Sequence, residues 1–227
     1  MKKIVIAIDG YSGCGKSTLA RQLAHKLNYV FLDTGAMYRA VTLYVLRHGI
    51  DWLDEAALTD ALTRIQIDMT ADAGGKTHTF LNQESVEEEI RGMAVSNRVS
   101  EVAAVPAVRR FLVEQQQRMG RNKGIVMDGR DIGTVVFPDA ELKLFVTADM
   151  ETRIQRRYLE LQANGFSVTG DEIRQNLEKR DFEETTRLDS PLRKAEDAIL
   201  LDNSHMTPEQ QLQFALDLAN GRIRKEN

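Results

Sequence analysis

The feature that most constrains the fold is a short apolar run that leads directly into a glycine-rich loop near the N-terminus. Residues 4–8 are all aliphatic, and Gly10-Tyr11-Ser12-Gly13-Cys14-Gly15-Lys16-Ser17 follow almost at once. Residues 17–27 then place a leucine at every fourth position, which predicts a helix with one apolar stripe. The order of strand, loop and helix is typical of a sheet that is covered by helices.

Four further apolar runs have the length of buried strands and are separated by helical stretches. They occupy residues 29–32, 125–127, 142–146 and 198–201. Runs that are apolar on both faces are typical of parallel strands with helices packed above and below. We therefore predict an α/β fold, a doubly wound parallel sheet of five strands. Ligands of such a sheet lie beyond the carboxyl ends of its strands, so the loops there should carry the chemistry.

Two stretches depart from this rhythm. Residues 64–82 alternate between apolar and polar types around Ala73-Gly74-Gly75, which predicts a small antiparallel hairpin. Residues 151–163 and 170–187 read as two helices joined by Asn164-Gly165-Phe166-Ser167, and the glycine there favours a mobile cover. We predict one domain over residues 1–227, with a core, an insertion at about 60–98 and a lid at about 151–190.

Charge and cysteine usage exclude several classes of protein. The 227 residues carry 30 Lys and Arg against 34 Asp and Glu, a net charge of −4, which argues against a basic nucleic-acid binder. The single cysteine, Cys14, cannot form an intrachain disulfide and fits a reducing compartment. The first apolar run is too short for a signal peptide or a membrane span. We expect a cytoplasmic monomer that binds neither nucleic acid nor a membrane.

The glycine-rich loop matches G-x-x-x-x-G-K-[ST] in full, with a strand before it and a helix after it. Glycines let the backbone curl so that its N–H groups point at phosphate oxygens, and the helix adds its positive end. Lys16 would bring its charge to the β- and γ-phosphates, and the Ser17 hydroxyl would bind Mg²⁺. A plain glycine turn is the alternative. We predict that ATP binds to Gly10, Tyr11, Ser12, Gly13, Cys14, Gly15, Lys16, Ser17 and Thr18.

Clusters of charged residues follow the second and third strands. Asp128 closes an apolar strand, where a carboxylate can hold Mg²⁺ or its waters, although a turn or cap is the alternative. Arg39 and Arg130 stand in glycine-bounded loops and could clamp a second phosphate with paired hydrogen bonds. The alternative for both arginines is a surface ion pair with Asp33 or Asp131.

The two late helices carry a third set of charges. Arg153, Arg156 and Arg157 lie on the first helix, and Arg180, Glu184 and Arg187 are spaced i, i+4 and i+7 on the second. A solvated helix face is one interpretation. The other is a lid whose arginines close over the phosphates and exclude water, as a phosphoryl transfer requires.

These motifs resemble the bacterial cytidylate kinases, members of the nucleoside monophosphate kinase group. The resemblance covers about residues 3–203. It rests on G-Y-S-G-C-G-K-S-T at 10–18, L-D-T-G-A-M-Y-R at 32–39, V-S-E-V-A-A-V-P-A-V-R at 99–109, D-G-R-D-I-G-T-V-V-F-P-D-A at 128–140 and L-L-D-N-S at 200–204.

The resemblance implies ATP-dependent phosphorylation of CMP and dCMP, with Mg²⁺ as cofactor. It implies that cytosine is read by Ser100, Arg109 and Asp131, the acceptor phosphate is held by Arg39, Arg130 and Arg187, and the ribose is held by Arg180 and Glu184. Asp33 and Thr34 belong to the same acceptor site, Thr34 keeping the hydroxyl of the more frequent Ser. Lys16, Arg130, Arg153 and Arg157 are the predicted catalytic groups of an in-line transfer. No general base is required, since the acceptor phosphate is already ionised.

Two positions depart from the family pattern. Glu184 stands where Asp is usual, which leaves the balance between CMP and dCMP open. Asn82-Gln83 replaces the more usual Asn-Gly, so we expect an altered turn after the hairpin. Two rival functions also remain. One is a kinase for UMP or another small acceptor, and the other is a nucleotide-dependent switch that hydrolyses its nucleotide slowly.

Overall fold

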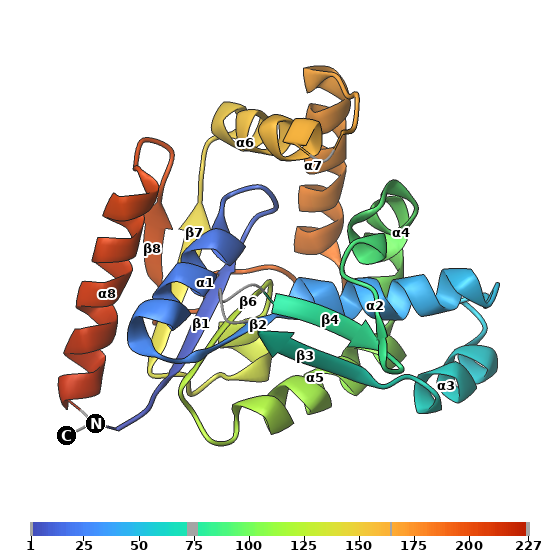
Figure 1. Ribbon diagram of the computed structural model, residues 1–227, viewed down its shortest axis with the longest axis horizontal. Coiled ribbons are helices and arrows are strands. Elements are labelled where there is room, and N and C mark those ends of the chain that lie inside the picture. The colour runs from blue at the N-terminus through green and yellow to red at the C-terminus, as the bar shows by residue number, and fades with distance from the viewer. Residues whose placement is uncertain (1, 72–76, 164, 226–227) are drawn as a thin grey trace. The chain divides into compact units, whose positions relative to one another are not determined.

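The chain divides into two compact units in the computed structural model, which describes residues 2–71, 77–163 and 165–225. The first unit comprises Met1–Phe31 and Asn122–Asn227, and the second comprises Leu32–Arg121. The large sheet has the strand order β2-β6-β1-β7-β8 (Figure 1). Its strands are β1 Val5–Gly10, β2 Val30–Asp33, β6 Ile125–Gly129, β7 Leu142–Thr147 and β8 Ile199–Asp202.

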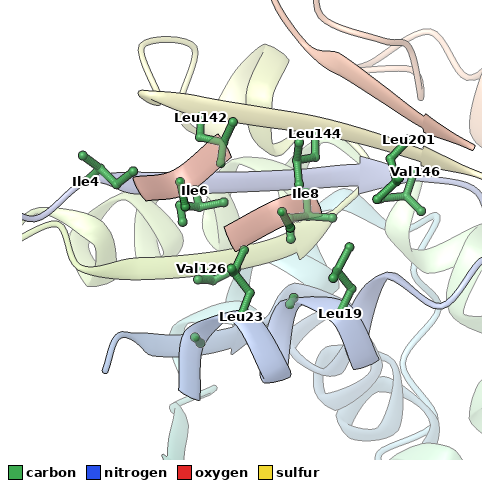
Figure 2. Packing of buried hydrophobic residues seen from close by; sticks show 14 of the residues in the cluster. Ile4, Ile6, Ile8, Leu19, Leu23, Val126, Leu142, Leu144, Val146 and Leu201 are labelled. Carbon is green, nitrogen blue, oxygen red and sulfur yellow. The ribbon is translucent and has the colours of Figure 1, made fainter. Parts of the chain in front are cut away.

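The sheet confirms the predicted parallel α/β fold and its five strands. β1 is central and pairs in parallel with β6 on one side and with β7 on the other. Helices α1 Lys16–Leu27 and α8 Pro208–Lys225 pack against each other and against this sheet. Figure 2 shows Ile6 and Ile8 of β1 between side chains of the neighbouring strands and the α1 residues Leu19 and Leu23. Strands that are apolar on both faces are buried in this way.

The two predicted late helices are present in the first unit. They are α6 Met150–Ala163 and α7 Gly170–Thr186, and they share an apolar contact that includes Ile154 and Leu177. Thr169 begins α7 with a capping box, in which its hydroxyl and the Glu172 carboxylate satisfy each other's backbone N–H groups. In the connection between the helices, Asn164 lies outside the described residues.

The second unit surrounds helix α2. Its helices are α2 Thr34–Arg47, α3 Glu55–Thr63, α4 Met93–Ala103 and α5 Pro106–Gly120, with a 3₁₀ turn, η1, at Glu89–Arg91. α2 packs against α4, α5 and the small sheet. Residues 60–98, predicted as an insertion, lie in this unit. Throughout the described part of the chain, each helix is too short or too polar to cross a lipid bilayer.

The small sheet of the second unit confirms the predicted hairpin. β3 Ile67–Ala71 and β4 Thr77–Leu81 pair antiparallel, and the predicted turn at Ala73-Gly74-Gly75 lies outside the described residues. The structure adds a third strand, β5 Glu84–Ser85, which the alternation did not reveal because two residues are too few to show a period.

The turn between β4 and β5 corrects the expectation of an altered turn. Leu81 pairs with Glu84, so Asn82 and Gln83 form a two-residue connection, and both have positive φ, +49° and +70°. Such a turn matches the twist of the flanking strands and favours Asn-Gly. The Asn82 side chain accepts a hydrogen bond from the Gln66 N–H at 2.8 Å, so Asn82 is suited to its place. Gln83 instead bears the steric cost of a left-handed backbone.

We predict that Gln83→Gly stabilises the protein by about 0.5–1 kcal/mol. Glycine removes the steric cost of the left-handed backbone, and the larger conformational entropy that glycine loses on folding offsets part of this gain. Urea unfolding monitored by circular dichroism measures the change. The matched control is Asn82→Gly, which should give no gain because it removes the hydrogen bond to Gln66. Equal stabilisation by both changes would contradict this account of the turn.

Candidate active site

The loop between β1 and α1 has the geometry of a phosphate-binding loop. Gly10 has φ +146°, and a Cβ there would lie 2.0 Å from the Val146 carbonyl oxygen of β7, so only glycine fits beside this strand. Gly15 precedes α1 in a left-handed conformation, φ +83°, and has no side chain to cap the helix. The first-turn N–H groups of α1 are therefore left for another acceptor, and an anion suits that position.

Lys16, the first residue of α1, is buried beside this loop. Its Nζ donates to the Tyr11 carbonyl oxygen at 2.6 Å and approaches the Cys14 Sγ at 3.7 Å. Burial lowers the pKa of Lys16, and the positive charge of Arg130 lowers it further. Burial and a nearby cation both destabilise the charged form of the ammonium, so a bound anion would stabilise it strongly.

Ser17 and Asp128 meet as the magnesium prediction requires. Asp128 ends β6, and its Oδ2 accepts from the Ser17 Oγ at 2.6 Å. Hydroxyl and carboxylate oxygens are the ligands that Mg²⁺ prefers, and two protein ligands suffice for an ion that also binds phosphates and water. The pair therefore fits the predicted Mg²⁺ site.

Asp9, which the sequence analysis did not single out, holds the loop that follows β6. Its buried carboxylate accepts from the N–H groups of Ile132 at 2.8 Å and Gly133 at 2.7 Å. Burial raises the pKa of Asp9 to about 6, although both hydrogen bonds oppose that rise. The signal in the sequence is an acidic residue at the end of an apolar strand, next to Gly10. Asp9 thus joins the phosphate loop to the loop that carries Arg130.

Arg130 pairs with Glu184 of α7, whereas the alternative from the sequence was a surface pair with Asp33 or Asp131. The Arg130 Nε donates to Glu184 Oε2 at 2.6 Å, and the Arg180 Nη2 donates to Glu184 Oε1 at 3.1 Å. Burial raises the pKa of Glu184, but the charges of Arg130 and Arg180 outweigh it and set this pKa at about 2. Arg187 donates to the Ser190 carbonyl oxygen and lies 4.0 Å from Asp131.

The arginines of α6 have three different environments. Arg153 is buried and donates to both carboxylate oxygens of Asp181 in α7, each at 2.7 Å. Arg156 donates to Asn203, which follows β8. Arg157 pairs with Glu160 at 2.8 Å, and its charge is close enough to Arg180 to lower the pKa of Arg180, after the larger effect of burial. The solvated helix face therefore does not describe Arg153.

The other predicted acceptor residues lie in the second unit. Asp33 caps α2 by accepting from the Ala36 N–H at 3.0 Å, and it pairs with Arg91, which the sequence analysis missed, at 2.9 Å. Burial raises the pKa of Asp33, but the charge of Arg91 and the hydrogen bonds from Arg91 and the Ala36 N–H together outweigh burial, so the net shift is downward. The Arg39 Nη1 donates to the Ser96 Oγ at 2.9 Å.

Arg109 of α5 is also buried in the second unit. Its Nη1 donates to the Ala103 carbonyl oxygen at 3.3 Å, and its guanidinium carbon lies 5.6 Å from the Tyr38 ring centroid. Ser100 lies one helix earlier, on α4, and Thr34 is the buried first residue of α2. A buried guanidinium over an aromatic ring is oriented by its surroundings, as a specific binding group must be.

Comparison with known proteins identifies the family. The sequence matches the cytidylate kinase family over residues 6–220. The chain belongs to the cytidylate kinase family. It is 54% identical over 224 residues to a cytidylate kinase of Flavobacterium psychrophilum, covering 97% of this chain and 99% of that protein. It is 52% identical over 230 residues to one of Bacteroides thetaiotaomicron, covering all of both.

A solved structure with a similar fold is an uncharacterized protein from Eubacterium ventriosum. It has a TM-score of 0.51 and 12% identity, and the match covers 97% of this chain and 99% of that one. At this identity the likeness bears on the fold alone. Membership of the cytidylate kinase family makes the chain a phosphotransferase with a phosphate group as acceptor.

We predict that Glu184→Gln destabilises the protein at pH 7 by about 3 kcal/mol, since the pKa of Glu184 is about 2 in the folded state and near 4.5 when unpaired. A lowered pKa stabilises the fold above about pH 4.5 and loses that effect as pH falls toward 2. The difference between the variant and the parent protein should therefore shrink below pH 4.5.

Urea unfolding at pH 7, 5, 4 and 3.5 measures this difference. Glu183→Gln is the matched control, because Glu183 pairs with Lys179 on a more exposed face and should contribute less than about 1 kcal/mol. A stability difference for Glu184→Gln that is independent of pH would contradict the ion-pair assignment.

Proposed function

We propose that this protein transfers the γ-phosphoryl group of ATP to CMP and dCMP, forming CDP and dCDP by in-line displacement. The observation that carries the proposal is that the phosphate loop shares the first unit with a second group of cations, Arg130 and Arg180, which are paired with the buried Glu184. Arg130 is close enough to Lys16 to lower its pKa, so the two cations face a common region. A kinase needs charge for a donor and for an acceptor phosphate, whereas a switch needs only one such site.

The donor side consists of the loop over residues 10–18 and Lys16. Its N–H groups and the Lys16 ammonium bind the phosphates of ATP and orient the γ-phosphate for displacement. Ser17 and Asp128 would hold Mg²⁺, whose charge neutralises the phosphate oxygens when it is bound. The hydrogen bond of Ser17 with Asp128 supports the Mg²⁺ assignment.

The acceptor side follows the family resemblance. We assign Arg39, Arg130 and Arg187 to the CMP phosphate, Arg180 and Glu184 to the ribose, and Ser100, Arg109 and Asp131 to cytosine, with Asp33 and Thr34 in the same site. Catalysis is then positioning and charge neutralisation, and the chain needs no general base. Of the two predicted lid arginines, Arg157 is the better candidate to neutralise developing charge, because the Arg153 guanidinium already donates to Asp181.

We also propose one kinase domain with a lid at about residues 151–190, acting as a cytoplasmic monomer on small nucleotides and not on nucleic acid. The net charge of −4 supports the last point, since nucleic-acid binders usually carry a basic surface. The small sheet of the second unit supports the substrate-binding insertion at about residues 60–98.

Product analysis with Mg-ATP and a panel of CMP, dCMP, UMP, AMP and GMP tests the proposal. We expect CDP and dCDP, with much slower formation of the other diphosphates. Turnover of ATP without any diphosphate would overturn the kinase assignment and favour the nucleotide-dependent switch. UDP as the main product would overturn the cytosine assignment, and the ratio of CDP to dCDP reports on Glu184.

The cytosine assignment predicts that changing Ser100 and Arg109 together to Ala lowers the ratio of kcat/KM for CMP to that for UMP by at least tenfold, because polar groups that read the base edge are lost. The measurement is substrate competition between CMP and UMP. Arg110→Ala, at the exposed neighbour of Arg109, is the control and should leave the ratio unchanged. An unaltered ratio in the double variant, with its thermal unfolding intact, would remove both residues from base recognition.

A further inference from the structure

The lid helix α6 contacts the phosphate loop at carbonyl oxygens. The Arg153 Nε donates to the Ser12 carbonyl oxygen at 2.8 Å, and the Arg156 Nη1 donates to the Cys14 carbonyl oxygen at 3.3 Å. The Asn203 Nδ2 also donates to the Cys14 oxygen, at 2.8 Å. Two alternate peptide groups of this loop therefore have their oxygens fixed by side chains from other elements.

These oxygens belong to the same peptide groups as the N–H groups of Gly13 and Gly15. No cis peptide occurs in the described residues, and in a trans peptide the C=O and N–H bonds point in opposite directions. Oxygens that point toward α6 and Asn203 leave the Gly13 and Gly15 N–H groups pointing the other way. A cationic donor on the oxygen also polarises the peptide and strengthens its N–H as a donor.

Arg153 is held by contacts on every side of its guanidinium. Asp181 accepts from Nη1 and Nη2, each at 2.7 Å, and the Ser12 oxygen accepts from Nε. The guanidinium carbon lies 5.3 Å from the Tyr11 ring centroid, and Arg153 is only 4% exposed. A guanidinium in this setting is fixed against the loop, and three of its five N–H donors are already used.

Arg156 and Asn203 form a second anchor that is connected to α8. The Arg156 Nη1 and Nη2 donate to Asn203 Oδ1 at 2.8 Å and to the Asn203 carbonyl oxygen at 3.0 Å. Asn203 is fully buried, and its Nδ2 donates to Gln211 Oε1 at 2.9 Å as well as to the Cys14 oxygen. The carbonyl oxygens of the loop are therefore bound both by arginines of α6 and by Asn203.

We propose that Arg153 and Arg156 act on bound ATP as positioning residues, through the Ser12–Gly13 and Cys14–Gly15 peptide groups, and do not contact the transferred phosphoryl group. Asp181 contributes by holding Arg153. The inference rests on the proposed function in taking ATP as the donor, and it reassigns Arg153 from charge neutralisation to loop orientation. Substitution of these residues should therefore weaken the binding of ATP.

Asp181→Asn separates the two roles of Arg153 by the sign of its effect. If Arg153 acts by its charge on phosphate, removal of the Asp181 carboxylate makes the site more positive and ATP binds more tightly. If Arg153 orients the loop, the variant loosens it and the ATP dissociation constant rises by about tenfold, the effect of one lost charge-assisted hydrogen bond. The matched control is Glu178→Gln, an exposed acid on the same helix, which should change this constant by less than twofold.

Titration calorimetry with Mg-ATP in the absence of CMP measures these constants, so the result does not depend on which acceptor the enzyme uses. Failure of the proposed function is detected separately, by the absence of CDP in the product assay. Unchanged or tighter ATP binding by Asp181→Asn would overturn the positioning role.

Arg153→Lys provides a second test that remains informative if Asp181→Asn folds poorly. Lysine keeps the charge but cannot donate to Asp181 twice and to Ser12 at once. We expect Arg153→Lys and Arg153→Met to raise the KM for ATP by similar factors, about tenfold, with kcat within threefold of the parent enzyme. A hundredfold fall in kcat for Arg153→Met that Arg153→Lys restores, with ATP affinity unchanged, would show direct charge neutralisation and overturn the proposal.

Discussion

The parallel pairing of β1 with both β6 and β7 is the constraint on which the rest of the site depends. Because β1 has a neighbour on each side, its carboxyl end is fixed relative to two other strand ends. Gly10 can lie so close to β7 only because it lacks a Cβ. The Asp9 carboxylate accepts hydrogen bonds from the loop after β6. The carboxyl end of β1 therefore positions both the phosphate loop and the loop that carries Arg130.

Most of this framework could be predicted from the sequence, since its causes are local. The strands are apolar on both faces, the glycine loop requires glycine at defined positions, and helices α6 and α7 follow a 3.6-residue period. The Arg180–Glu184 pair was within reach for the same reason, because residues four apart on a helix are neighbours.

The remaining features depend on residues that are distant in the sequence. A helix pattern shows that Arg153 belongs to α6, but it gives no indication that Asp181 of α7 accepts from both Nη1 and Nη2 of its guanidinium. Asp9 reads as an ordinary strand end until the backbone 123 residues later is placed beside it. Gln83 was expected to alter its turn, yet strand pairing on both sides retains the left-handed geometry and Gln83 bears the strain. In each case a tertiary contact outweighs a local preference.

Carboxylates paired with arginines explain how a chain with a net charge of −4 can present a cationic site. Arginines that share a buried region repel one another and lose hydration, so they stay in place only if anions compensate them. Glu184 compensates Arg130 and Arg180, and Asp181 compensates Arg153. Both acids lie on α7, three residues apart. This one helix therefore helps to position Arg153, which contacts the phosphate loop, and Arg130. An anionic substrate then meets cations whose orientation was already set on folding, which reduces the reorganisation that binding and phosphoryl transfer would otherwise require.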